Sequence, residues 1–430
     1  MKQQTIKIAY GFMAVILLFG SSCTKDYVNP GAATDEQVFS SPQGLTGVAV
    51  GLQRVYTAGR GSSLYNRVTM DGLLTSQMVV INQGNTSEYQ LQLGGGSVDG
   101  TNTIVAGLWT TSNKIIYDAD KVITSATALA DKPYASGLIG YSTIFKALAL
   151  GDLAMFWEQV PASTGQNVSF ENRVQGFARA ISAIDNALAA ISTAPISASF
   201  LANIPAGVDI VNTLYALKAR YSLFIGNYSQ ALTAANAVDL TKKSTLNFTT
   251  VNLNPIFETA TSTNNVTAVS DVATLGLPVG LQPDPADKRL SFYTTTAYAS
   301  KILGFGALST TPWPIYLPGE ITLIKAEAYA RQAAPDLVNA LIELNKVVTK
   351  KPANDPFGVG ADLPPLAGLT QQQILDQIYK HRSIELFLSG LKLEDMRRFA
   401  RANSEKKRNF LPYPFQERDN NKNTPPDPAF

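Results

Sequence analysis

The sequence is poor in the residues that build most metal and catalytic centres. Its 430 residues include one cysteine and one histidine. One cysteine excludes an internal disulfide, and the shortage of both residues excludes a zinc knuckle and an HExxH metal site. A histidine-based triad would have to use His381, which lies between Lys380 and Arg382 without a nucleophile motif nearby. We therefore expect no catalytic residues, no metal ion and no cofactor.

The chain also lacks a strong excess of charge. It has 35 basic and 33 acidic residues, and the two counts are equal once Lys2 and Lys7 of the predicted leader are left out. Nucleic-acid binding needs a concentrated basic surface, so we expect none. The Gly94–Gly96 run lacks the lysine and hydroxyl residue of a phosphate-binding loop. The 45% of hydrophobic residues predicts a large buried core instead.

The N-terminus has the pattern of a secretory signal peptide. Lys2 and Lys7 are followed by an apolar stretch from Ile8 to Phe19 and then by small residues up to Ser22. The stretch is shorter than the roughly 20 residues that span a bilayer as a helix. We predict that residues 1–22 are a signal peptide and that residues 23–430 form the mature chain.

The only cysteine follows these small residues directly. Its setting resembles a bacterial lipobox, although Gly20 stands where leucine is usual. Cys23 is therefore predicted to carry a lipid anchor; a free cysteine near an ordinary cleavage site is the alternative. Lys25 and Asp26 resemble the signal that sends some lipoproteins to the outer face of the outer membrane.

Helical periodicity dominates the mature chain and predicts an all-α fold. Apolar residues recur every three or four positions in 44–56, 105–129, 138–160 and 174–191. Residues 212–240 and 321–348 each resemble a tetratricopeptide hairpin, in which small residues let two helices pack closely. Thr370 and Gln373 form a capping box that opens a closing helix.

Irregular segments interrupt the helices. Residues 77–103 are predicted to form a long polar loop, and 241–318 an insertion rich in Asn, Thr and Pro. The first half is thus helical hairpins to about residue 240, and residues 319–430 hold closing helices and a tail. The proline-rich tail is predicted to lie extended over the surface.

Four segments together resemble a known family. They are ILDQIYKHRSIELFLSGLKLEDMRRFARA (374–402), PGEITLIKAEAYA (318–330), FLPYPFQERDNN (410–421) and IFKALALGDLAMFWEQVP (144–161). With the lipoprotein start, they resemble the SusD/RagB family of surface nutrient-binding lipoproteins. The family's usual ending, Asn-Pro-Gly-Tyr, appears here as TPPDPAF.

The resemblance implies a fold of tetratricopeptide-like hairpins with a loop-rich second half. It also implies an outer-membrane lipoprotein that faces the cell exterior. Such a protein would bind a glycan or oligosaccharide, or less typically a peptide, and deliver it to a SusC-like TonB-dependent transporter without breaking bonds. Two alternatives remain: a surface glycosidase or peptidase, whose paired carboxylates are defined only in space, and a protein-binding tetratricopeptide scaffold.

Aromatic residues in irregular segments are the candidate ligand contacts, because flat rings stack on sugar faces. Trp313, between two prolines, is predicted to be an exposed platform, with Tyr293, Tyr298 and Tyr89 as further candidates. Packing of these loops on the core is an equally compatible alternative. Trp109 and Trp157 lie on apolar helix stripes and are predicted to be core residues.

A charged cluster lies in an apolar setting near the closing helix. It consists of Arg382, Glu385, Asp395 and Arg397. Buried charges persist only when they are paired, because desolvation must be offset by a partner. We predict structural ion pairs that fix a turn at Gly390; a binding or catalytic cluster is the alternative.

The lipid anchor gives the first testable prediction. Cys23→Ser should release the protein from membranes, because it removes the only thiol that could carry lipid. Membrane fractionation measures the release. Mass spectrometry that finds an unmodified Cys23 in the mature wild-type protein would contradict the prediction.

Overall fold

The computed structural model describes residues 34–261 and 265–430. The chain divides into two units, with the boundary between Val38 and Phe39. The short helix α2 (Asp35–Phe39) begins in the first unit. The predicted signal peptide and Cys23 lie outside the described residues. The account below concerns the second unit, Phe39–Phe430.

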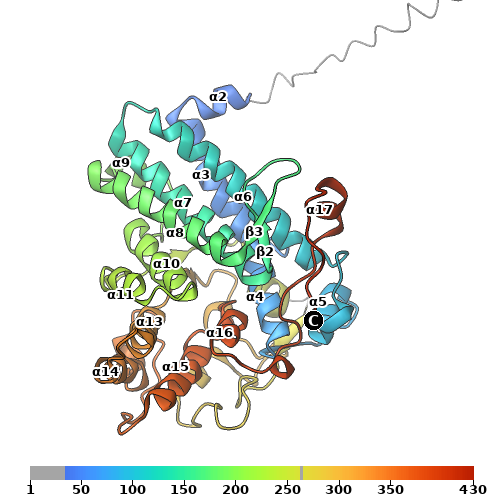
Figure 1. Ribbon diagram of the computed structural model, residues 1–430, viewed down its shortest axis with the longest axis vertical. Helices are drawn as coiled ribbons and strands as arrows, with labels where there is room; N and C mark the ends of the chain where they lie inside the picture. The colour runs from blue at the N-terminus through green and yellow to red at the C-terminus, as the bar shows by residue number, and fades with distance from the viewer. Residues whose placement is uncertain (1–33, 262–264) are drawn as a thin grey trace, which may run out of the picture. The chain divides into compact units, whose positions relative to one another are not determined.

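Helices form most of the first half of this unit (Figure 1). They are α3 (Pro42–Thr57), α4 (Ser63–Leu74), α5 (Thr86–Leu93), α6 (Thr103–Thr127), α7 (Lys132–Phe156), α8 (Arg173–Thr193), α9 (Ala198–Leu201), α10 (Ile210–Phe224) and α11 (Tyr228–Asn236). The long helices α6, α7 and α8 lie side by side with α7 in the middle. The predicted all-α fold is confirmed.

Helix α7 is the centre of the first half. It begins earlier than the apolar pattern predicts, because Asp131 accepts a hydrogen bond from the backbone N–H of Tyr134 at 3.0 Å and caps the helix. Among the described residues it alone is long and apolar enough to cross a membrane. Its side chains from Ala135 to Phe156 are almost all buried by neighbouring helices, which accounts for its composition.

The two predicted hairpins are present and stack on each other. In the first, α10 and α11 are joined by a turn in which Gly226 has φ +77°, a backbone conformation that favours glycine. Ala231 and Ala235 are fully buried and let the helices approach closely. The second pairs α13 (Pro318–Arg331) with α14 (Leu337–Val348), and α11 packs against α13.

The polar segment 77–103 is not the long loop that its composition predicts. It contains β1 (Met78–Val80), the helix α5 and the 3-10 turn η1 (Gly95–Ser97). Strand β1 pairs in antiparallel fashion with β5 (Thr267–Val269) of the insertion. This pairing joins the polar segment to the insertion, although nearly 190 residues of sequence separate them.

The insertion is irregular, as predicted, with a few short elements. They are β4 (Thr245–Leu246), the π-helical turn η2 (Phe257–Thr261), β5, α12 (Lys288–Tyr293), η3 (Gly304–Gly306) and β6 (Trp313–Pro314). Strands β4 and β6 pair with each other. A separate hairpin of β2 (Gln159–Pro161) and β3 (Phe170–Asn172) joins α7 to α8.

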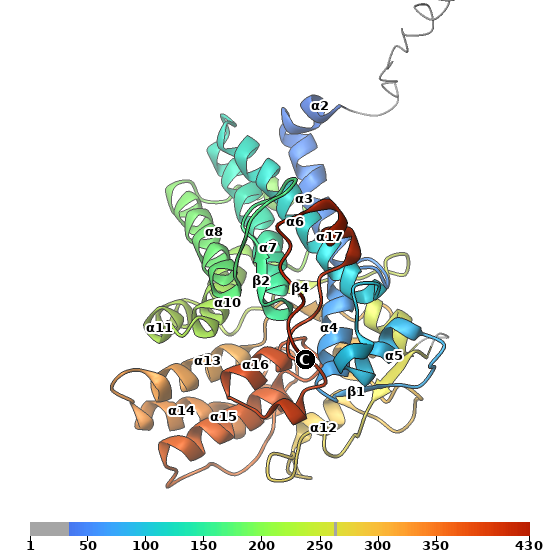
Figure 2. The same ribbon diagram turned by 45° about the vertical axis from the view of Figure 1, so that its right-hand side comes forward.

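The closing elements return the chain to the first half (Figure 2). They are η4 (Pro352–Asn354), α15 (Gln371–Glu385), α16 (Lys392–Arg398), η5 (Asn403–Glu405) and α17 (Phe415–Asn420). The predicted capping box opens α15. The tail does not lie wholly on the surface as predicted: Leu411 and Tyr413 are buried, and Trp157 donates a hydrogen bond to the carbonyl of Pro412 at 3.0 Å. The tail segment therefore completes the core.

Arg382 and Asp395 form a buried, bidentate ion pair. Arg382 donates from Nε at 2.8 Å and from Nη2 at 3.1 Å to the two carboxylate oxygens. Arg398 pairs with the same carboxylate and with Glu327 of α13. The guanidinium groups hold the pKa of Asp395 below its ordinary value in spite of burial. These pairs connect α13, α15 and α16.

The carboxylate of Glu385 forms ion pairs with two basic side chains in the interior. Its carboxylate accepts from Arg289 at 3.0 Å and from Lys350 at 2.6 Å, so it joins α15 to the insertion. Arg289 Nη2 also lies 2.8 Å from Nδ1 of His381, and burial with this neighbouring charge holds the pKa of His381 well below its ordinary value. A side chain at Gly319 would collide with the carboxylate, because its Cβ would lie 1.8 Å from Oε1.

Arg397 and Asp71 connect α16 to the first half. Arg397 bonds Glu394 at 2.7 Å and the carbonyl of Met155 at 2.7 Å. Asp71 accepts from the backbone N–H of Leu393 at 2.7 Å at the start of α16, while burial raises its pKa to about 6. Between α15 and α16, Gly390 has φ +79°, and a Cβ there would lie 2.8 Å from Cγ of Arg67.

The pairing yields a stability prediction. Asp395→Ala should lower the free energy of unfolding by about 3–5 kcal/mol, because it leaves the buried Arg382 without its partner. Asp118→Ala, which removes a pair with the exposed Lys114, is the matched control and should cost about 1 kcal/mol or less. Chemical denaturation measures both. A stable Asp395→Ala protein that lost only ligand binding would contradict the structural role.

Candidate functional site

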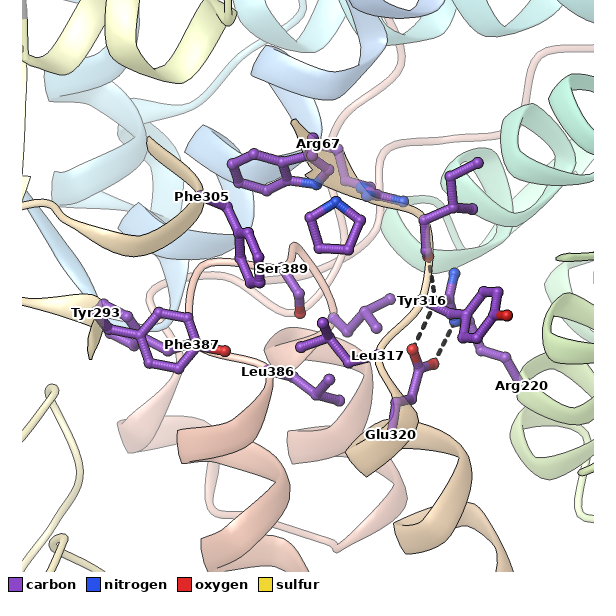
Figure 3. Close-up of a pocket in the computed structure, with 14 residues that line it drawn as sticks. Arg67, Arg220, Tyr293, Phe305, Tyr316, Leu317, Glu320, Leu386, Phe387 and Ser389 are labelled. Atoms are coloured by element: carbon purple, nitrogen blue, oxygen red, sulfur yellow. Dashed lines mark hydrogen bonds and ion pairs between the residues drawn. The ribbon is translucent and has the colours of Figure 1, made fainter. Parts of the chain in front are cut away.

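Trp313 and Tyr293 lie together around one small cavity (Figure 3). They are 5% and 3% exposed. The cavity measures about 30 Å³, which is room for a water molecule and not for a sugar. Its other lining residues are Arg67, Arg220, Phe305, Pro314, Ile315, Tyr316, Leu317, Glu320, Leu386, Phe387, Ser389 and Leu391. The prediction that Trp313 is an exposed platform is wrong.

Trp313 is buried because two short strands of the insertion, β4 and β6, pair with each other. Trp313 belongs to β6, where it lies opposite Leu246 of β4, and its ring packs edge-on against Phe305. Tyr293 donates a hydrogen bond from its hydroxyl to the carbonyl of Glu385 at 2.5 Å and so belongs to the interior too. The alternative from the sequence, packing of the insertion on the core, holds for both residues.

An ion pair closes one side of the same cavity. Arg220 donates from Nε and Nη2 to Glu320 at 2.6 Å and 2.8 Å, as the dashed lines in Figure 3 show. Its Nη2 also donates to the carbonyl of Ile315 at 2.9 Å. Arg220 comes from α10 and Glu320 from α13. This pair therefore holds the two predicted hairpins together.

The remaining predicted aromatics lie elsewhere. Tyr298 is 53% exposed in the insertion, and Tyr89 is half-buried on α5. Their predicted ligand contacts remain predictions. Trp109 and Trp157 are buried, as predicted, with ring centroids 4.9 Å apart.

A larger and more polar hollow, the α3 cleft, lies between the C-terminal end of α3 and the start of the insertion. It has a volume of about 500 Å³, within the range of small-molecule sites. Its lining residues are Val50, Gln53, Arg54, Thr57, Ala58, Gly59, Pro205, Asn247, Phe248, Thr249, Thr250, Val251, Asn252, Leu253 and Glu258. Amides, hydroxyls, one cation and one carboxylate thus face a common space.

Arg54 is distinguished by the absence of a side-chain partner among residues 34–261 and 265–430. Among the arginines of the described residues, it is the one whose guanidinium makes no ion pair, hydrogen bond or ring contact. Its five N–H groups are available to a ligand that offers pairs of oxygen acceptors. Nothing in the sequence marks this residue, because an exposed arginine on an amphipathic helix is ordinary; its unpaired state is a tertiary property.

The polar segment adjoins this end of α3. Arg60 in the turn after α3 donates from Nε to Glu88 of α5 at 2.9 Å and from Nη2 to Asn85 at 2.8 Å. The hydroxyl of Tyr65 donates to the same Glu88 oxygen at 2.9 Å. These bonds connect the polar segment to the α3–α4 turn and to the start of α4.

The α3 cleft offers binding groups and no recognisable catalytic set. Its lining contains no histidine or cysteine, and the single histidine is buried beside Arg289. Over residues 34–261 and 265–430, no three His, Cys, Asp or Glu side chains are grouped to hold a metal ion. The arrangement can form multiple hydrogen bonds to a polar, hydroxyl-rich ligand.

Comparisons with known proteins agree with this fold. The sequence model of the SusD family matches residues 297–427. A SusD superfamily protein from Bacteroides fragilis superposes with a TM-score of 0.68 at 18% identity and covers 90% of this chain and 99% of its own. A SusD-like carbohydrate binding protein from the same species gives 0.64 at 13% identity, with 86% and 88% covered.

A laminarin binding SusD-like protein gives a TM-score of 0.62 at 14% identity, covering 90% of this chain and 99% of its own. A search of curated protein sequences found no match. The chain has the SusD fold over most of its length and the family's sequence signature in its last third. The resemblance to the SusD/RagB family that the sequence predicts is confirmed.

The burial of Trp313 gives a prediction that separates core from site. Trp313→Ala should lower the free energy of unfolding by about 3–5 kcal/mol, because it opens a cavity beside Phe305. Tyr298→Ala, at an exposed aromatic of the same insertion, should change it by only about 0.5 kcal/mol. Chemical denaturation compares the two. Equal stabilities for both variants would show that Trp313 is not a core residue.

Proposed function

We propose that this protein binds a saccharide at the α3 cleft and delivers it to a TonB-dependent outer-membrane transporter without cleaving it. The observation that carries the proposal is the unpaired guanidinium of Arg54 in a polar cleft of about 500 Å³. A guanidinium with free donors recognises neighbouring ligand oxygens, and the surrounding Thr, Asn and Gln side chains suit hydroxyl groups.

The family supports the same ligand class. Two solved structures with this fold are described as a carbohydrate binding protein and a laminarin binding protein. The lipid anchor at Cys23, exposure on the cell exterior and the SusC-like partner remain proposals that follow from the leader and from the family resemblance. A protein anchored at the outer surface would capture cargo close to the transporter that imports it.

The rivals make different predictions. A glycosidase would release products, and a tetratricopeptide scaffold would bind proteins and not saccharides.

A protein that captures and releases its ligand without cleavage is expected to bind it only moderately tightly. A surface cleft that must release its cargo should bind with a dissociation constant of about a micromolar or weaker.

Calorimetry with Arg54→Gln tests the proposal. The wild-type protein should bind at least one member of a panel of laminarihexaose, maltohexaose and trigalacturonic acid, and Arg54→Gln should weaken that binding about tenfold or more by removing charged donors. Chromatography of the incubated saccharides should show no products.

Arg401→Gln is the matched control, because this arginine is paired with Glu405 and lines no part of the α3 cleft. It should bind the panel as the wild type does. Released products would favour the glycosidase. Saccharide binding that is equal in Arg54→Gln and wild type would remove the α3 cleft from the site.

A further inference from the structure

A second polar hollow, the α17 cleft, lies where α6, the loop of the β2–β3 hairpin and α17 meet. Figure 2 shows α17 beside α6 and next to this hairpin. The cleft has a volume of about 400 Å³. It is lined by Trp109, Thr110, Asn113, Tyr117, Pro161, Ser163, Thr164, Gly165, Val168, Pro414, Gln416, Glu417 and Asn420. Three segments that are distant in sequence therefore build one concave surface.

Hydrogen bonds fix the walls of the α17 cleft relative to one another. Trp109 Nε1 donates to Glu417 Oε2 at 3.0 Å, which ties α6 to α17. Asn421 Nδ2 donates to Glu417 Oε1 at 2.9 Å and to the carbonyl of Val168 at 3.1 Å, which ties α17 to the hairpin loop. A ligand would meet a site that is already formed, so little ordering cost opposes binding.

The lining is polar and nearly free of charge. Glu417 is its only charged side chain, and both of its oxygens already accept hydrogen bonds. The amides of Asn113 and Asn420 each donate to the backbone of their own helix, at 2.9 Å and 2.7 Å, and their Oδ1 atoms accept no bond from the described residues. The side chains of Gln416, Thr110, Ser163 and Thr164 make no hydrogen bonds with described residues.

An exposed aromatic ring completes the lining. Tyr117 lies two turns along α6 from Trp109 and is 46% exposed. The ammonium of Lys121 lies 4.7 Å from its ring centroid and covers one face. A tyrosine ring among hydroxyls and amide oxygens with unused hydrogen-bonding capacity is the combination that recognises a sugar, since the ring meets C–H groups and the polar groups meet hydroxyls.

We propose that the α17 cleft is a second binding site, for an uncharged pyranose unit of a saccharide. An anionic ligand is disfavoured because the only charged lining residue is the carboxylate of Glu417. An apolar ligand is disfavoured because it would displace water from the unused amide oxygens and hydroxyls and leave them without a hydrogen-bond partner. A short peptide could form hydrogen bonds with the same amide groups. The footprinting experiment below compares a peptide with saccharides to distinguish the two ligand classes.

The proposal is independent of the α3 cleft. The two clefts share no lining residue: one is built by α3 and the start of the insertion, and the other by α6, the hairpin loop and α17. Two sites on one chain would hold a long saccharide at separate points, so that weak contacts add through effective concentration. If Arg54→Gln did not affect saccharide binding, the proposed site at the α3 cleft would be wrong, but the proposed site at the α17 cleft would still stand.

Hydroxyl-radical footprinting with mass spectrometry tests the site on the purified chain. Phe415 is an internal reference, since it is 53% exposed and flanks the lining residues without being one of them. Laminarihexaose or maltohexaose at about 10 mM, above the millimolar constants of weak sites, should lower the ratio of Tyr117 to Phe415 oxidation about twofold or more. Radical scavenging by the saccharide lowers both rates alike and cancels in the ratio.

Two variants sharpen the result. Asn420→Ala removes an exposed side chain with a free acceptor and should abolish the protection of Tyr117 without changing the melting temperature. Arg54→Gln should leave the protection as in the wild type. An unchanged oxidation ratio with both saccharides would overturn the proposal. Protection by trialanine alone would overturn the saccharide assignment, and loss of protection in Arg54→Gln would overturn the independence of the two sites.

Discussion

The fold depends on the pairing of arginines that have been taken out of water. Arg289 and Arg382 are completely buried, and each meets at least one carboxylate from another part of the chain. Removal of one partner would leave an uncompensated charge in the interior, which costs far more than the loss of a surface pair. Glu385 is central to this arrangement because it joins the insertion, α15 and Lys350 at one point. These ion pairs join the irregular second half to α15, and apolar residues of the insertion pack in the same core.

The pairing of buried charges also helps to identify the candidate binding sites. Where nearly every guanidinium has a protein partner, the unpaired Arg54 in a polar cleft is the exception that a ligand can complete. In the α17 cleft the free groups are neutral amides, hydroxyls and one exposed ring, while its carboxylate is already satisfied. The two clefts thus differ in chemistry: one presents an unpaired guanidinium, and in the other every unused polar group is neutral.

Aromatic residues show where reasoning from sequence was insufficient. Trp313 lies between prolines in an Asn- and Thr-rich stretch, and such a stretch normally lies on the surface. The short β4–β6 pairing turns it inward against Phe305, and two residues of pairing leave no periodic signal in the sequence. The polar composition of segment 77–103 likewise does not indicate β1, whose partner β5 is far along the chain. Long-range pairing of short strands is decided by contacts that no local pattern records.

The sequence by itself determined the helical class, the two stacked hairpins, the capping box of α15 and the family signature in the last third, because helical periodicity and caps are local properties. It also indicated that the charges around Arg382 lie in an apolar setting. Tertiary structure alone decided which carboxylate each arginine meets, which aromatics are buried, and which polar groups stay free to bind. Those outcomes depend on segments that meet only after folding, such as α6, the hairpin loop and α17.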